Sequence, residues 1–224
     1  GMIYRVRHQT TLTYLAPVED AQLAVRLRPA PWPGQKVLRQ KLALTPEPHE
    51  VRESDGPYLV RSTGLLFRTP LKRLDVLSEF EIEVSPPADP GSGPSVHAVR
   101  QAALSSRDLT ALSPAPYLFG SRIATMHDAI AAWAAPLVDD ARGVIDVART
   151  VNSAIHRHFS YMPGTTDSET SPFEAFRAKR GVCQDFAHVM IVALRSQGIP
   201  AAYVSGYLRT VPPPGMAKLV GADA

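Results

Sequence analysis

Polar and apolar residues alternate in short runs through the first part of the chain, and Pro and Gly separate the runs. A period of two with turn residues between the runs is typical of antiparallel strands that have one face in water. The pattern therefore predicts a β-rich N-terminal domain over residues 1–85. The alternating runs are 4–8, 23–28, 37–44, 58–61 and 80–84.

Proline and glycine then gather between residues 85 and 94. Such a stretch can neither continue a strand nor begin a helix, because Pro lacks a backbone N–H and Gly adds conformational freedom. We expect a linker at residues 86–94 and a domain boundary near residue 90.

Beyond the linker, apolar residues recur at steps of three and four, which is typical of amphipathic helices. This predicts a helical connector over residues 95–140, followed by a second helix that Asp139 or Asp140 can cap. The two apolar stripes are Ile123, Met126, Ile130 and Trp133, and then Val144, Val147, Val151, Ile155 and Phe159.

A third helix start lies at residues 171–174. Ser171 offers a cap hydroxyl, Pro172 suits the first helical position, and Glu174 can reach back to the N–H of the cap. We expect this helix to run to about residue 180 and to stop at Gly181.

The next periodic segment begins at residue 182 or 183 and ends at Gly198, with Pro200 after it. It turns Phe186, Val189, Met190 and Ala193 inward. Residues 201–209 contain Tyr and Val and are predicted as a strand. Helices followed by a strand predict an α+β core over residues 141–224.

The amino-acid composition excludes several classes of function. The chain has 224 residues with 24 Lys+Arg, 21 Asp+Glu and a formal charge of +3. Its basic residues are interleaved with acidic ones, which argues against nucleic-acid binding. One cysteine excludes an internal disulfide and indicates a reducing, cytoplasmic location. The longest apolar stretch, residues 129–138, is too short for a membrane span, and no leader is recognisable.

Cys183 is the candidate nucleophile. In the first turn of a helix, unpaired N–H groups and the positive end of the macrodipole favour a thiolate, and the same N–H groups can receive the oxyanion of an attacked carbonyl. The alternative is that a lone cysteine is a small apolar side chain of the core. The position of Cys183 alone does not decide between these two interpretations.

No base for this thiol is evident from spacing. His188, five residues on, lies roughly 140° around the helix from Cys183, and Asp185 points nearly the opposite way. Both are interpreted as buried or half-buried supports, and a metal site from these three residues is not expected. His156 and His158 are expected at the surface.

The run Gly-Val-Cys-Gln-Asp-Phe-Ala-His at 181–188 precedes Gly-Ile-Pro-Ala at 198–201 and Val-Ser-Gly-Tyr at 204–207. Together they closely resemble the cysteine segment of bacterial transglutaminase-like proteins, over about residues 144–209. Tyr-Arg-Val-Arg-His at 4–8 and Arg-Leu-Arg-Pro at 26–29 are similar to the N-terminal region that accompanies this core.

The resemblance implies an α+β fold with a papain-like core, a Cys-His-Asp triad and acyl transfer from an amide through a thioester, without a cofactor or a metal. It places the nucleophile on Cys183. Tyr161 matches an aromatic position before the cysteine that helps to stabilise the oxyanion. Gln184, Asp185 and His188 match supporting positions of the cysteine motif and are not the triad acid and base.

The sequence departs from the family after Tyr207. The triad histidine of the family opens a His-Ala-Trp strand and the aspartate lies in a later Asp-Pro segment, but no histidine follows His188 here. Gly1 before Met2 is typical of a scar left by tag removal. We therefore expect a truncated, incomplete transglutaminase-like core with little or no catalytic activity.

Two functions follow. The first is a thiol enzyme acting on peptide or protein substrates, with water slightly favoured over an amine as acceptor. The second is a binding or scaffolding module that keeps the fold without using the thiol. In either case residues 201–209 would present an open strand edge, so dimerisation there is expected.

Overall fold

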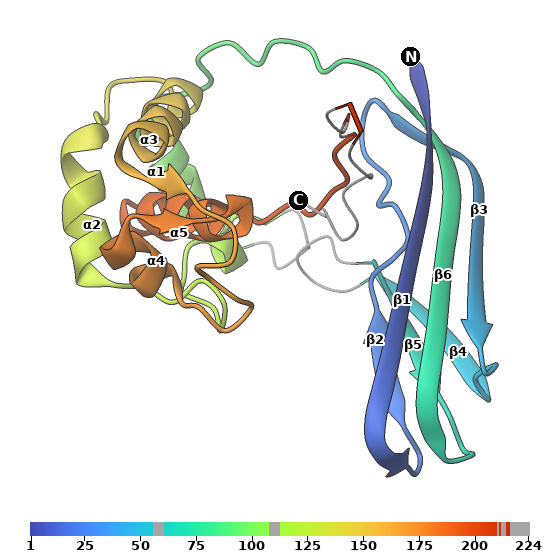
Figure 1. Cartoon of the computed structure of the whole chain (residues 1–224). Helices are drawn as coiled ribbons and strands as arrows, with labels where there is room; N and C mark the ends of the chain where they lie inside the picture. The colour runs from blue at the N-terminus through green and yellow to red at the C-terminus, as the bar shows by residue number, and fades with distance from the viewer. Residues whose placement is uncertain (56–60, 108–112, 210, 212–213, 216–224) are drawn as a thin grey trace. The chain divides into compact units, whose positions relative to one another are not determined.

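The protein was analysed as a computed structural model that describes residues 1–55, 61–107, 113–209, 211 and 214–215 (Figure 1). The described residues form two compact units, one made of residues 1–89 and the other of residues from Pro90 onward. Antiparallel sheets come first and helices follow. The α+β class predicted from the sequence is confirmed.

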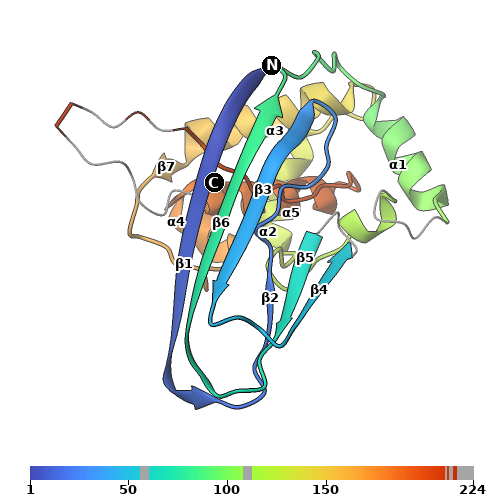
Figure 2. The ribbon, with the colours of Figure 1, turned by 90° about the vertical axis from the view of Figure 1, so that its right-hand side faces the viewer.

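Where it is described, the N-terminal unit has two antiparallel three-stranded sheets. The long strands β1, β6 and β3 lie side by side in the order β1-β6-β3 (Figure 2), and the shorter ones follow the order β2-β5-β4. The strands are β1 (Met2–Val18), β2 (Gln22–Val25), β3 (Gln35–Thr45), β4 (Glu50–Asp55), β5 (Arg61–Leu66) and β6 (Leu71–Val84).

Strand β6 has the predicted period of two: Leu74, Val76, Ser78, Phe80 and Ile82 are buried, and the residues that alternate with them are partly exposed. Residues 58–60 of the predicted run 58–61 lie outside the described residues. Strand β4 was not predicted, because it is almost entirely polar and exposed and owes its conformation to pairing with β5.

The second unit is mainly helical, and its two short strands β7 and β8 form a parallel pair. Among the described residues, no helix has both the length and the apolar character needed to cross a membrane. The elements are α1 (Val96–Ser105), η1 (Ala115–Tyr117), α2 (Asp128–Ala134), η2 (Ala135–Leu137), α3 (Val144–His158), β7 (Ser160–Tyr161), α4 (Pro172–Ala178), β8 (Arg180–Gly181) and α5 (Cys183–Ser196).

The core of this unit lies between α3 and α5, with α2 against α5. The apolar stripe predicted for α3 is confirmed, because Val147, Val151 and Ile155 are buried. The capping box predicted at Ser171 is also present: its Oγ accepts from the Glu174 N–H, and Glu174 accepts from the Ser171 N–H.

Two predicted helix starts are wrong. Helix α2 begins at Asp128, because Nδ1 of His127 accepts from the Ala129 N–H and so caps the helix; Ile123 lies before it and is exposed. Helix α3 is not capped by Asp139 or Asp140. Its N-cap is Gly143, and the carbonyls of residues 94 and 92 accept from its first two N–H groups.

The strand predicted at residues 201–209 is also wrong. Apart from one bridge position at Tyr207, these residues form no strand in the structure. A strand needs a hydrogen-bonded neighbour, whereas this segment is fastened at Ala201: its N–H donates to Tyr117 O at 3.1 Å, and its carbonyl accepts from Arg195 Nε at 2.9 Å.

Candidate active site

Cys183 is the first residue of α5, and its side chain is exposed. The preceding chain fixes this position. Lys179 ends α4 in the left-handed conformation (φ 53°), residues 180–181 pair with β7, and Val182 is extended before the helix begins. The first N–H groups of a helix have no partners within the helix. The exposed sulfur therefore lies beside backbone donors.

Asp185 fixes the start of α5 through two hydrogen bonds. Its Oδ2 accepts from the Val182 N–H at 2.8 Å and from Thr166 Oγ1 at 2.6 Å, and the residue is buried. Gly181 packs directly on it, because a Cβ at Gly181 would lie 2.6 Å from Asp185 Oδ2. The carboxylate is thus a structural anchor that joins α5, β8 and the segment around residue 166.

Tyr161 is brought to the same place by the β7–β8 pair, in which it is the register partner of Gly181. The Met162 N–H donates to Gly181 O at 2.8 Å, and the Ser160 N–H donates to Lys179 O at 2.9 Å. Tyr161 is 64% exposed. An exposed phenol and an exposed thiol, far apart in sequence, therefore flank one short parallel strand pair.

Aromatic rings support the first turn of α5. Phe186 lies 5.9 Å from Phe159, and Phe159 contacts Trp133 and Phe176 at 6.1 and 5.9 Å between ring centroids. Each of these residues packs against or belongs to the core of the unit. The residue immediately before β7 is therefore buried against the helix that carries the cysteine, which aligns the two sides of the site.

The other polar candidate residues differ in their exposure to solvent. Gln184 is exposed next to Cys183, whereas His188 is buried. His156 and His158 are exposed at the end of α3, as predicted. Within the described ranges, no group of three His, Cys, Asp or Glu side chains could hold a metal ion.

Comparison with known families shows the family of the chain. Residues 4–83 match the bacterial transglutaminase-like N-terminal region, and residues 131–219 match the transglutaminase-like superfamily. The chain belongs to the transglutaminase-like superfamily. Tyr161, Cys183, Gln184, Asp185 and His188 all lie within the second match.

Its relatives include uncharacterised mycobacterial proteins. One from Mycobacterium tuberculosis is 34% identical over 227 residues, covering 99% of this chain and 70% of the relative. One from Mycobacterium leprae is 32% identical over 205 residues, covering 91% and 70%. A solved structure named "Putative Cysteine Protease", from Cytophaga hutchinsonii, superimposes with a TM-score of 0.65 at 19% identity, covering 89% of this chain and 67% of that one. This likeness shows a shared fold.

His188 occupies a buried position of this transglutaminase-like core. Its ring lies 5.1 Å from the Tyr203 ring, measured between centroids, and Asp185 is one helical turn earlier. Burial lowers the pKa of His188 below its ordinary value of 6.5, and the negative charge of Asp185 partly opposes that shift. The neutral imidazole is therefore the form that the folded state favours.

This shift predicts a pH dependence of stability. Because the unfolded state takes up the proton first as the pH falls below about 6.5, the free energy of unfolding should decrease between about pH 7 and pH 5 and level off once the folded imidazole is also protonated. His188→Gln should remove this component, and His156→Gln at the exposed end of α3 should keep it. Urea unfolding at several pH values measures this component. If the free energy of unfolding of wild type and of His188→Gln depended equally on pH, the expectation would be contradicted.

Proposed function

We propose that this chain carries the nucleophile of a thiol enzyme that acts on peptide or amide substrates through a thioester at Cys183. One observation supports this above all: the only cysteine of the chain is exposed at the first position of α5. A cysteine kept for packing would be buried, since free cysteines are among the most buried residue types. Membership of the transglutaminase-like superfamily adds to this argument.

The proposed reaction has two steps. Cys183 Sγ, having passed its proton to a general base, adds as the thiolate to the substrate carbonyl carbon; the C–S bond forms, the C–N bond breaks, and the amine leaves with that proton. Water or a second amine then attacks the thioester, and the thiol is released. N–H groups of the first turn of α5 and the Tyr161 hydroxyl are suited to stabilise the oxyanion. Gln184 lies exposed beside them, and Asp185 and His188 act as supports.

We favour water as the acceptor, which makes the reaction a hydrolysis. The chain spans 70% of its Mycobacterium tuberculosis relative, and we propose that a longer gene product carries the activity. The 224-residue chain has seven histidines and none after His188, which is buried. A base and its orienting carboxylate contribute orders of magnitude to such reactions. We therefore expect the 224-residue chain, assayed alone, to have at most about one thousandth of the turnover of a longer gene product.

The experiment compares the 224-residue chain with the longer gene product, and each with its Cys183→Ala variant. Iodoacetamide should label both native proteins at Cys183, because the side chain is exposed. Only the longer protein should release amines from a casein substrate, and Cys183→Ala should abolish that release. Rapid labelling without turnover in the longer protein would favour the scaffolding module instead, and comparable turnover of both lengths would refute the proposed inactivity of the shorter one.

Location and assembly belong to the same proposal. A single exposed thiol is suited to the cytoplasm, where thiols stay reduced. Val204, Leu208 and Val211 are exposed at 85%, 65% and 82%, and apolar residues so placed are suited to a dimer contact. A purely monomeric elution profile at high protein concentration would argue against the dimer.

A further inference from the structure

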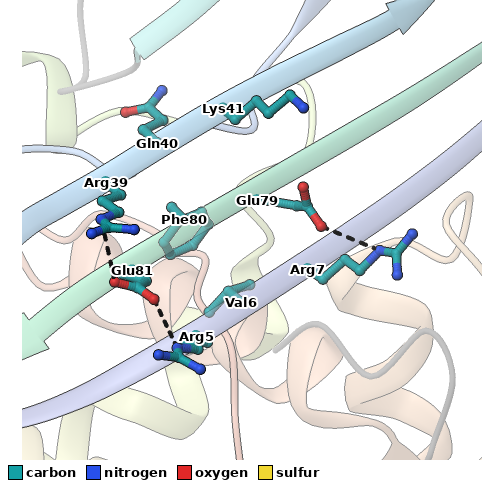
Figure 3. A pocket seen from close by; sticks show the side chains of 9 residues that line it. All are labelled: Arg5, Val6, Arg7, Arg39, Gln40, Lys41, Glu79, Phe80 and Glu81. Atoms are coloured by element: carbon teal, nitrogen blue, oxygen red, sulfur yellow. Dashed lines mark ion pairs between the residues drawn. The ribbon is translucent and has the colours of Figure 1, made fainter.

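Charged side chains form two rows across the sheet β1-β6-β3. The register places Arg5 and Arg39 on either side of Glu81, and it places Arg7 and Lys41 on either side of Glu79. Each glutamate of the central strand is thus flanked by a cation from both edge strands. We call these six residues the cationic ladder: Arg5, Arg7, Arg39, Lys41, Glu79 and Glu81 (Figure 3).

Each row of the ladder carries a net charge of +1. Glu81 pairs with Arg5 at 2.7 Å and with Arg39 at 4.0 Å, so one carboxylate is shared by two guanidinium groups. Arg5 and Arg39 are each 84% exposed, whereas Glu81 is 26% exposed. In the second row Arg7 pairs with Glu79 at 3.5 Å. The carboxylates therefore lie low between the cations, and the outer layer of this face is positive.

The ladder lines a hollow of about 630 Å³. Val6, Gln40 and Phe80 also line it, and strand alternation turns their side chains to the opposite face, so their backbone forms the floor. The two edge strands lie about 10 Å apart across β6. An extended chain fits between the two lines of cations.

We propose that the cationic ladder binds an extended acidic peptide segment that runs along β6. The two rows are two residues apart along each strand, which is about 6.7 Å, and alternate side chains of an extended peptide have the same spacing. A peptide with a carboxylate at every second residue can therefore place successive carboxylates over successive rows. This gives the N-terminal unit a binding role that does not depend on the proposed thiol chemistry.

A peptide suits the ladder better than a nucleic acid does. Glu79 and Glu81 form the middle of each row and repel a continuous line of phosphates. The alternate side chains of an extended peptide all point the same way, so its carboxylates can lie over the cations of one edge strand and away from the central glutamates. Binding of single-stranded nucleic acid also relies on aromatic side chains for base stacking, and none of the six ladder residues is aromatic.

The test uses the whole 224-residue chain and fluorescence anisotropy of a labelled peptide of about twelve residues with alternating Glu and Ser. At about 50 mM salt we expect a Kd on the order of 100 µM. At about 500 mM salt, where the Debye length is about 4 Å, the Kd should rise at least about tenfold. Arg5→Gln with Arg39→Gln should have a similar effect, because one row then becomes negative. Arg52→Gln with Arg122→Gln removes the same charge from exposed positions elsewhere and should leave the Kd within about twofold.

Each contrary result overturns the proposal. Equal binding of a peptide of the same composition with its Glu residues in one block would show that the spacing is not recognised. Tighter binding of an oligothymidylate would assign the face to nucleic acid. An equal loss in the Arg52 and Arg122 variant would assign binding to net charge. The peptide and salt comparisons use the wild-type protein, so they decide the matter even if a variant folds poorly.

Discussion

Gly181→Ala should lower the free energy of unfolding of the second unit by about 2–4 kcal/mol and disrupt the helix start that carries Cys183. The added Cβ would lie 2.6 Å from Asp185 Oδ2 and 2.9 Å from Asp185 Cβ. Asp185 is buried and cannot move away without losing its bonds to the Val182 N–H and to Thr166 Oγ1. Overpacking costs about 1–3 kcal/mol, and a hydrogen bond to a charged group is worth about 1.5–3 kcal/mol.

The matched control is Gly206→Ala, because a Cβ at Gly206 meets nothing within 4 Å. It should change stability by less than about 0.5 kcal/mol. Trp133 packs on Phe159 and Phe176, so its fluorescence in a Trp32→Phe background reports the second unit alone during urea unfolding. Equal midpoints for the two alanine variants would show that Gly181 tolerates a side chain.

Asp185→Ala should destabilise the second unit by about 3 kcal/mol. The change leaves the Val182 N–H and the Thr166 hydroxyl without their shared acceptor in a buried place, and each lost charge-assisted bond costs about 1.5–3 kcal/mol, partly offset where water enters. Loosening of the first turn should also change the native-state rate of Cys183 alkylation. Asp185→Asn keeps the shape and one acceptor oxygen, so it should lose less than half as much.

Asp128 offers a control for the helix dipole, because it lies in the first turn of α2 and is exposed. Asp128→Ala removes the same charge from the first turn of another helix and should cost about 0.3–1 kcal/mol. A loss at Asp185 no larger than the loss at Asp128 would mean that Asp185 acts through the dipole alone, and the anchoring role would have to be abandoned.

The sequence predicts the structural features that depend on local interactions. The capping box at Ser171 and Glu174 needs only residues three apart, and the start of α5 at Cys183 follows from the turn residues before it. The apolar stripe of α3 was equally clear, because its period persists over four turns. Such features depend only on residues that are close along the chain, so they can be predicted from the sequence alone.

Of the predictions that failed, one has a local cause and the others depend on distant partners. The stripe from Ile123 to Trp133 is broken by a histidine acting as an N-cap, a role seldom assigned to His. Residues 201–209 have the composition of a strand, yet Ala201 bonds to Arg195 and Tyr117 instead of to a neighbouring strand. Thr166 has no motif at all and joins the site only because its hydroxyl reaches Asp185. The ladder was hidden for the same reason, since Arg5, Arg39 and Glu81 meet only after the strands pair.

The parallel pairing of β7 with β8 has a consequence for how this site can diverge. Parallel strands cannot be joined by a tight hairpin, so the chain must depart after Tyr161 and return before Gly181. Residues 162–179, including α4, make that excursion. Insertions or deletions within it that leave Thr166 bonded to Asp185 can remodel what surrounds the thiol, while Tyr161 and the start of α5 keep their alignment. The surroundings of the thiol and the strand pair beside it are thereby encoded in separable stretches of the gene.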